Sequence, residues 1–205
     1  MSVAAPRRNF IIVTEGAKTE PNYFKALRDE RKLATVQIVF EHSTRTDPVG
    51  LTQYAIKLRD ERAKGARGGD GVEYDEVWVV FDLEQPASPR RAQAQQARQL
   101  PRAGGIQFAL SDPCFEYFLL LHFESTTKAF SDCADVTKRL IQSWTGYTKG
   151  GPLPSELLAR APIAIGRAKS VREDSTTKGG TNSPSSDVDR LLVQLVPAIL
   201  AAKKS

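Results

Sequence analysis

An α/β fold, with a mostly parallel sheet flanked by helices and a C-terminal helical extension, is the architecture that this 205-residue sequence predicts. Up to about residue 124, short runs of apolar and β-branched residues alternate with longer amphipathic segments, as strands and helices do around a parallel sheet. Beyond that point the apolar spacing becomes helical. A hydrophobic content of 40% is sufficient for the core of one compact domain of this length.

The first half is expected to alternate strand and helix throughout. Thr19 is suited to cap the first helix and Pro21 to its first turn, where backbone N–H groups have no intrahelical acceptor. Glycines at 65–71 and 104–105 mark the loops that precede later strands. The expected elements are a strand at 9–14, a helix from 20 or 21 to about 32, a strand at 36–41, a helix through 51–58, a strand at 76–81, a helix at 90–100 and a strand at 106–110.

The second half is expected to be helical. Residues 114–123 are so strongly apolar that they must be largely buried. Further helices are expected at 131–144, 155–173 and 187–202, with the Ser-, Thr-, Gly- and Pro-rich segment 174–186 as a loop. We therefore expect a core at 1–124 and a helical extension at 125–205 that packs on the core as one structural unit.

Charge and cysteine content restrict the class of protein. The net charge of +5 and the pI near 9.3 permit a polyanionic partner but do not require one. Cys114 and Cys133 are too few for a four-sulfur zinc site, and without a secretion signal we expect reduced thiols in the cytoplasm; a disulfide is the unsupported alternative. No stretch reaches the roughly 20 apolar residues that cross a bilayer, so no membrane association is expected.

Carboxylates follow two of the predicted strands, at the point where each strand ends. Glu15 follows the first strand, and Asp82 and Glu84 follow the third. Ligands of open α/β sheets bind beyond the carboxyl ends of the strands. Carboxylates ~4 Å apart repel by about 4 kcal/mol at an effective dielectric constant of 20, so a cluster needs protons, water or a cation. Mg²⁺ or Mn²⁺ suits such oxygen ligands; solvated strand ends are the alternative interpretation.

Other enzyme signatures are weak or absent. Ala17 stands before Lys18 and Thr19, where a Walker A loop needs glycine, and the sequence has no G-x-G-x-x-G after a strand and no G-x-S-x-G elbow. Neither His42 nor His122 has a companion at zinc-binding spacing. On its apolar segment, His122 is expected to be a packed, hydrogen-bonded core residue.

Several of these segments resemble the RloB-like protein family. The resemblance is carried by Thr14 to Phe24, Phe81 to Glu84, Ser111 to Glu116 and Leu119 to Phe123, and by the later segments 147–149, 164–169 and 181–188, so it covers nearly the whole chain. It implies a Toprim-type core in which Glu15 and Asp82 with Glu84 bind magnesium. It also implies a nuclease role in prokaryotic phage defence, often beside restriction or abortive-infection genes.

The chain departs from the family pattern at two positions. Glu84 stands in place of the second aspartate of an Asp-x-Asp pair and is one methylene longer. Asp112 stands where the family more often has asparagine, and it is expected to cap the following helix or else to add charge to the site. Glu116, inside an apolar helix, is expected either to assist the site as a further acid or to form a salt bridge to Arg167 or Arg190.

The leading hypothesis is a Mg²⁺-dependent nuclease that cleaves RNA, including tRNA, or DNA in the cytoplasm during anti-phage defence. Glu15, Asp82, Glu84 and Glu116 are its candidate acids. The alternatives are a non-catalytic adaptor or sensor that binds nucleic acid or nucleotide beside a partner ATPase or restriction-system component, and a primase-like transferase. The sequence leaves the oligomeric state open. Candidate phosphate contacts are Lys18, Arg45, Lys149, Arg167 and Lys169.

Overall fold

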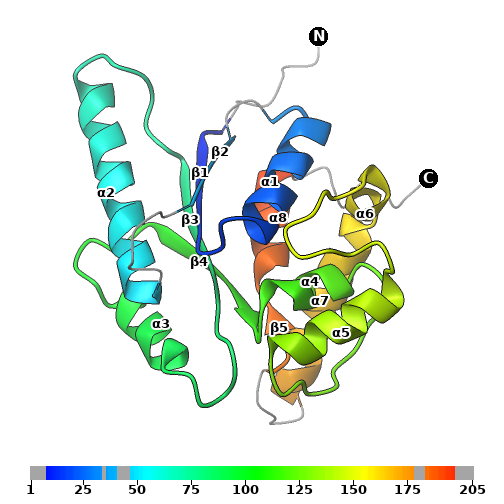
Figure 1. Ribbon diagram of the computed structural model, residues 1–205. Helices are drawn as coiled ribbons and strands as arrows, with labels where there is room; N and C mark the ends of the chain where they lie inside the picture. The colour runs from blue at the N-terminus through cyan, green and yellow to red at the C-terminus, as the bar shows by residue number, and fades with distance from the viewer. Residues whose placement is uncertain (1–7, 34–35, 41–46, 178–182, 197–205) are drawn as a thin grey trace.

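The computed structural model describes residues 8–33, 36–40, 47–177 and 183–196, and it confirms the predicted α/β class. Five strands form one sheet in the order β2-β1-β3-β4-β5 (Figure 1). The first four are parallel, and β5 pairs antiparallel with β4. The strands are β1 (Phe10–Thr14), β2 (Val36–Phe40), β3 (Glu76–Asp82), β4 (Ile106–Asp112) and β5 (Ser185–Ser186).

Helices cover both faces of the sheet. Helices α2 (Pro48–Arg67) and α3 (Arg90–Arg98) lie on one face, and α1 (Thr19–Glu30) lies on the other with the helices of the second half (Figure 1). Those helices are α4 (Phe115–Leu120), α5 (Cys133–Ser143), α6 (Ser155–Ala159), α7 (Ala161–Thr177) and α8 (Val188–Leu195).

The strands are apolar on both sides because both faces are covered. Successive side chains of a strand point to opposite faces, so Ile11 and Phe81 pack with α2 and α3, whereas Ile12 and Trp78 pack with α1 and the later helices. The buried cluster that contains Ile12 and Trp78 also includes residues beyond 124, among them Leu192 in α8. Sheet and extension therefore share one hydrophobic core, and the division at residue 124 stays a prediction.

The register places the ends of two central strands side by side. Thr14, the last residue of β1, lies opposite Val80 of β3. The backbone N–H of Glu15 then donates to the carbonyl of Val80 at 3.0 Å, which extends the pairing by one residue. Glu15 and Asp82 consequently leave the sheet at the same edge, as expected for neighbouring parallel strands.

The structure corrects several predicted element boundaries. The helix expected at 155–173 is two helices, because Pro162 has no N–H to bond the carbonyl four residues earlier. Helix α1 begins at Thr19 itself, so Thr19 is not its cap. The segment expected to be a loop at 174–186 contains the end of α7 and the short strand β5, whose two residues are too few to give a periodic signal. Residues of the last predicted helix beyond 196 lie outside the described residues.

The expectation of reduced thiols is wrong for this structure. Cys114 and Cys133 form a disulfide with their Cα atoms 5.7 Å apart. Cys114 precedes α4 and Cys133 opens α5, and these two helices pack together. The contact depends on that helix packing, which the 19-residue separation of the cysteines in the sequence does not indicate.

Among the described residues, no helix is both long and apolar enough to cross a membrane.

Candidate functional site

A cavity of about 690 Å³ opens at the carboxyl edge of the sheet. Its walls come from the loop between β1 and α1, the end of β3, the beginnings of α4 and α5, and the segment before α6. The residues that line it are Glu15, Gly16, Ala17, Lys18, Thr19, Glu20, Asp82, Glu84, Cys114, Glu116, Cys133 and Lys149. The cavity therefore brings together all four acids that the sequence predicted, Glu15, Asp82, Glu84 and Glu116, and adds Glu20.

Glu15 is held by backbone and side-chain donors. Its Oε2 accepts hydrogen bonds from the backbone N–H of Asp82 at 3.3 Å and from Arg90 at 2.8 Å. Its Oε1 lies 2.6 Å from the second terminal nitrogen of Arg90, so the ion pair is bidentate. Burial nevertheless raises the pKa of Glu15, since desolvation outweighs the favourable charge of Arg90.

Asp82 is in the least compensated position of the cavity. Its Oδ1 is buried and has no hydrogen-bond partner within the described part of the chain. Burial raises the pKa of Asp82 well above its usual range, and the neighbouring carboxylates of Glu20, Glu116 and Glu15 raise it further. The backbone N–H of Phe115, at the start of α4, lowers it by a smaller amount. An unpartnered buried oxygen among like charges is stable only when it is protonated or next to a cation.

Glu20 is a site residue that the sequence reasoning did not identify. It is 6% exposed, and burial together with the charges of Glu116 and Glu15 raises its pKa to about 7. Its carboxylate folds back over Gly16, where an added Cβ would lie only 2.1 Å from Oε2. A side chain at position 16 would therefore have to displace the carboxylate of Glu20. The sequence did place Glu20 in the first turn of the helix after the Glu15 strand. An acidic residue at that position is common in helices, because it interacts favourably with the helix dipole, so it did not indicate a site residue.

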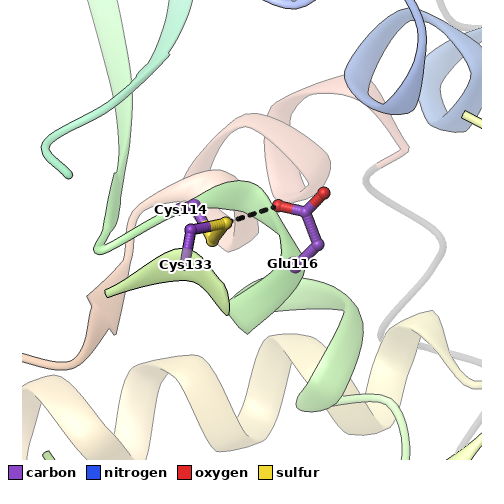
Figure 2. A group of neighbouring side chains, drawn as sticks. All are labelled: Cys114, Glu116 and Cys133. Atoms are coloured by element: carbon purple, nitrogen blue, oxygen red, sulfur yellow. Dashed lines mark hydrogen bonds between the residues drawn. A yellow bond between two sulfur atoms is a disulfide. The ribbon is translucent and has the colours of Figure 1, made fainter. Parts of the chain in front are cut away.

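Glu116 is buried, with 3% exposure, and its carboxylate contacts Tyr147 and Cys133; Figure 2 shows the contact with Cys133. The hydroxyl of Tyr147 donates to Oε1 at 2.9 Å, and Sγ of Cys133 lies 3.4 Å from Oε2. The alternative of a salt bridge is not found among the described residues. Arg167 instead donates to the carbonyl of Leu121 at 2.9 Å, and Arg190 lies 3.5 Å from Asp187.

Arg90 connects the two outer acids of the site. Its Nε lies 2.9 Å from Oε1 of Glu84, while its terminal nitrogens hold Glu15. Glu84 has a φ of 58°, an uncommon conformation for a non-glycine residue, and its backbone N–H donates to the carbonyl of Pro113 at 2.8 Å. Its side chain is 51% exposed, so Glu84 forms the rim of the cavity rather than its floor. The arginines that follow Glu84 in the sequence gave no sign of this role.

The five candidate phosphate contacts are not all at the cavity. Lys18 and Lys149 line it, and Asn22 of α1 holds the segment next to Lys149 by donating from Nδ2 to the carbonyl of Gly150 at 3.0 Å. Arg167 and Lys169 are on α7 and do not line the cavity; Lys169 lies 3.7 Å from Glu173. Arg45 lies outside the described residues.

Asp112 is neither a helix cap nor a cavity residue. Its Oδ2 pairs with Arg91 at 2.6 Å, and its Oδ1 accepts from the hydroxyl of Ser183 at 3.2 Å. The residue before α4 is Cys114, which makes no side-chain cap. The cap expectation is therefore wrong, because Asp112 is still part of β4 and its side chain is directed to α3 and the C-terminal segment.

His122 is a core residue, as predicted. Its two ring nitrogens contact the hydroxyl of Tyr23 at 3.1 Å and the carbonyl of Phe118 at 3.0 Å. Burial lowers its pKa to about 4, so the ring is neutral at physiological pH. It takes no part in the cavity.

The donor types in the cavity suit a hard divalent cation, although among the described residues the three ligand atoms that lie within 4.8 Å of one another are those of Cys114, Glu116 and Cys133 and not three carboxylates. Glu15, Glu20, Asp82 and Glu116 supply carboxylate oxygens, the ligands that Mg²⁺ and Mn²⁺ prefer. The unpartnered oxygen of Asp82 supports this fit independently of the resemblance to a family. A bound cation with its water ligands would offset the like charges that, together with burial, raise the pKa values of Glu20 and Asp82.

The protein-family model described as RloB-like protein matches residues 10–195. No curated protein and no solved structure matches the chain.

Proposed function

The chain belongs to the RloB-like protein family, and from that premise we propose that it is a cytoplasmic, Mg²⁺- or Mn²⁺-dependent nuclease that cleaves phosphodiester bonds of RNA or DNA. Family membership indicates a defence-associated protein. The nuclease activity, its metal and its nucleic-acid substrate are our proposal, as is an anti-phage role in abortive infection.

One observation carries the proposal: the buried, unpartnered oxygen of Asp82 lies among three other carboxylates at the edge of the sheet where ligands bind. Leaving a buried polar atom unsatisfied costs about 1–3 kcal/mol, and like charges add to that cost. A fold that keeps such a cluster gains nothing in stability from it, so the cluster is better explained by the binding of a cation.

The residues divide into three roles. Asp82, Glu20 and Glu116 would hold the cation from the floor of the cavity, with Glu15 beside them. A bound Mg²⁺ would neutralise phosphate charge and make water more acidic. Lys18 and Lys149 would bind phosphates that flank the scissile bond, since both are at the mouth of the cavity. Arg90 is a positioning residue, because it fixes the carboxylates of Glu15 and Glu84.

The test is cleavage of end-labelled RNA and DNA by the purified protein with Mg²⁺, with Mn²⁺ or with a chelator. Asp82→Asn keeps the size of the side chain and removes its charge, so we expect it to lower metal-dependent cleavage by at least about 100-fold, about 3 kcal/mol of transition-state stabilisation. Glu61→Gln is the matched control, since Glu61 is exposed on α2 and lies 3.9 Å from Lys57. Full activity in Asp82→Asn would contradict the proposal.

A non-catalytic adaptor is the second candidate. It is favoured by Arg90, which already compensates Glu15 and Glu84 in the way that a cation would. Such a module would bind nucleic acid or nucleotide at Lys18 and Lys149 and work with a partner ATPase or a restriction-system component. Calorimetric titration with Mg²⁺, followed by binding and cleavage assays, separates the two. Tight substrate binding without cleavage in any divalent metal would favour the adaptor.

A further inference from the structure

We propose that Cys114, Cys133 and Glu116 form a second metal site, for a thiophilic divalent cation such as Zn²⁺, when their disulfide is reduced. One ligand atom from each of the three lies within 4.8 Å of the others. They come from the residue before α4, the first turn of α4 and the first residue of α5 (Figure 2). This site is distinct in chemistry from the all-carboxylate floor of the cavity.

The contact between Cys133 and Glu116 is the first argument. Sγ of Cys133 lies 3.4 Å from Oε2 of Glu116. A disulfide sulfur carries no proton, so in the oxidised protein this contact brings together two atoms that have only lone pairs. A thiol proton or a metal ion between the atoms makes the same contact attractive. The arrangement thus suits the reduced or metal-bound state better than the disulfide.

The second argument is the orientation of Glu116. Tyr147 donates to Oε1 at 2.9 Å, which fixes the carboxylate and leaves Oε2 directed at the sulfur atoms. Hydrogen bonds that orient a ligand in this way are a regular feature of metal sites. Glu116 is also buried, so its oxygen has little competing water.

The donor set identifies the class of cation. Two thiolates and one carboxylate are soft enough to select Zn²⁺ over Mg²⁺, and three protein ligands leave one coordination position for water. With Cα atoms 5.7 Å apart, the two cysteines bring their sulfur atoms within reach of one ion at Zn–S distances of about 2.3 Å.

The site is coupled to the redox state. A dithiol reductant transfers two electrons and two protons to the disulfide; the S–S bond breaks, two thiols form, and the reductant becomes a disulfide itself. Binding of Zn²⁺ then releases the two thiol protons. Oxidation by a disulfide-class oxidant reverses the process and expels the cation, so disulfide and metal exclude each other.

Glu116 is shared with the carboxylate cavity, which gives the site a consequence for activity. Zn²⁺ at the sulfur atoms would withdraw Glu116 from the cluster around Asp82 and Glu20, to whose raised pKa values it contributes. This consequence rests on the proposed function, whereas the metal site itself does not.

Cobalt titration tests the site without any activity assay. The protein is reduced with a phosphine under inert gas, freed of reductant, and titrated with Co²⁺. We expect thiolate-to-cobalt charge-transfer absorption and tetrahedral ligand-field bands that saturate at one ion per chain and disappear on addition of Zn²⁺. The oxidised protein should show neither. Reduced protein that shows no thiolate absorption would overturn the proposal.

Variants assign the ligands. Cys133→Ser should abolish the charge-transfer band; should that variant not fold, the oxidised wild-type protein makes the same comparison. Glu116→Gln should keep the band but bind Co²⁺ at least about tenfold more weakly, whereas Glu61→Gln should match the wild type. Unchanged affinity in Glu116→Gln would remove Glu116 from the site. Asp82→Asn should bind Co²⁺ normally while losing nuclease activity, so failure of the thiolate site and failure of the proposed function remain distinguishable.

Discussion

At the scale of single residues, Glu20 shows that ionised carboxylates are destabilised in the cavity. The carboxyl group is buried over Gly16, and the charges of Glu116 and Glu15 add to the desolvation that raises its pKa to about 7. In the unfolded chain the group returns to a value near 4.5. That difference corresponds to about 3 kcal/mol. The folded state therefore binds a proton more tightly than the unfolded state does.

The raised pKa of Glu20 in the folded state predicts how the free energy of unfolding depends on pH. The contribution of Glu20 is fully present below pH 4.5 and is lost as the pH rises through about 7. In a chelator, the unfolding free energy of the wild type relative to Glu20→Gln should therefore fall by up to about 3 kcal/mol between pH 5 and pH 8. Urea unfolding of both proteins at each pH measures it. A difference that does not change with pH would show that Glu20 titrates normally.

Arg90 gives a second prediction at this scale. The Arg90→Gln substitution removes the guanidinium group with which both Glu15 and Glu84 form ion pairs. We expect the metal-free protein to lose about 1–3 kcal/mol of stability, and Mg²⁺ to raise its melting temperature by more than it does in the wild type. Thermal melts with and without Mg²⁺ measure both effects. Arg102→Gln, which removes an exposed partner of Asp60, should change neither. An equal Mg²⁺ effect in Arg90→Gln and the wild type would mean that Arg90 does not compete with the cation.

At the scale of secondary-structure elements, the helices differ in how they begin. Asp47 accepts hydrogen bonds from the backbone N–H groups of Val49 at 3.0 Å and Gly50 at 3.2 Å, so α2 has a side-chain cap. Among the described residues, helices α1 and α4, which begin at the cavity, have no such cap, whereas α5, which also begins there, is capped by Asp132, whose Oδ1 accepts from the backbone N–H of Asp135 at 3.0 Å. The backbone N–H of Phe115 in α4 is instead directed to Asp82. The start of α4 thus contributes a donor to the site, whereas Asp47 and Asp132 cap only their own helices.

The cap of α2 is open to test. Asp47→Ala leaves two backbone donors without their acceptor and should lower the unfolding free energy by about 1 kcal/mol. Asp70→Ala makes the same substitution at an exposed aspartate just past the other end of the helix and should cause no loss. Chemical unfolding measured by circular dichroism compares them. Equal stability of the two variants would show that the cap is not used.

At the scale of the whole molecule, the sheet and the C-terminal helices depend on each other. Ile12 and Trp78 of the sheet belong to the same buried cluster as Leu140 of α5 and Leu192 of α8. Strand β5, which comes from the C-terminal part, pairs with β4. Removing the extension would expose the part of this sheet face that α1 and α4 do not cover, so the two parts should not unfold separately.

The two tryptophans can report on this coupling. Trp78 is buried in β3, and Trp144 stacks on Phe123 in the C-terminal half, with ring centroids 5.7 Å apart. We expect the single-tryptophan variants Trp78→Phe and Trp144→Phe each to show a fluorescence transition that coincides with the loss of helix by circular dichroism. A Trp144 signal that changes before the helices melt would establish the extension as a separate unit.

The order of strands and helices, and the position of Glu15 and Asp82 at strand ends, could be predicted from the sequence. Both depend on local patterns: runs of apolar residues that end at a polar one, and the rule that carboxyl ends of parallel strands share an edge. The break at Pro162 was also a local signal. It was outweighed by the helical spacing around it.

Tertiary structure alone decided the partners of these groups. Arg90 reaches Glu15 across 75 residues, Tyr147 reaches Glu116 across 31, and Cys133 reaches Cys114 across 19. Such contacts depend on how the helices pack and on where the side chains point, and the spacing of residue types along the sequence predicts neither. The sequence by itself therefore determined the fold class and the edge at which the acids gather. Only the folded chain decided which acids are buried together, because burial and repulsion arise from distances in space rather than along the chain.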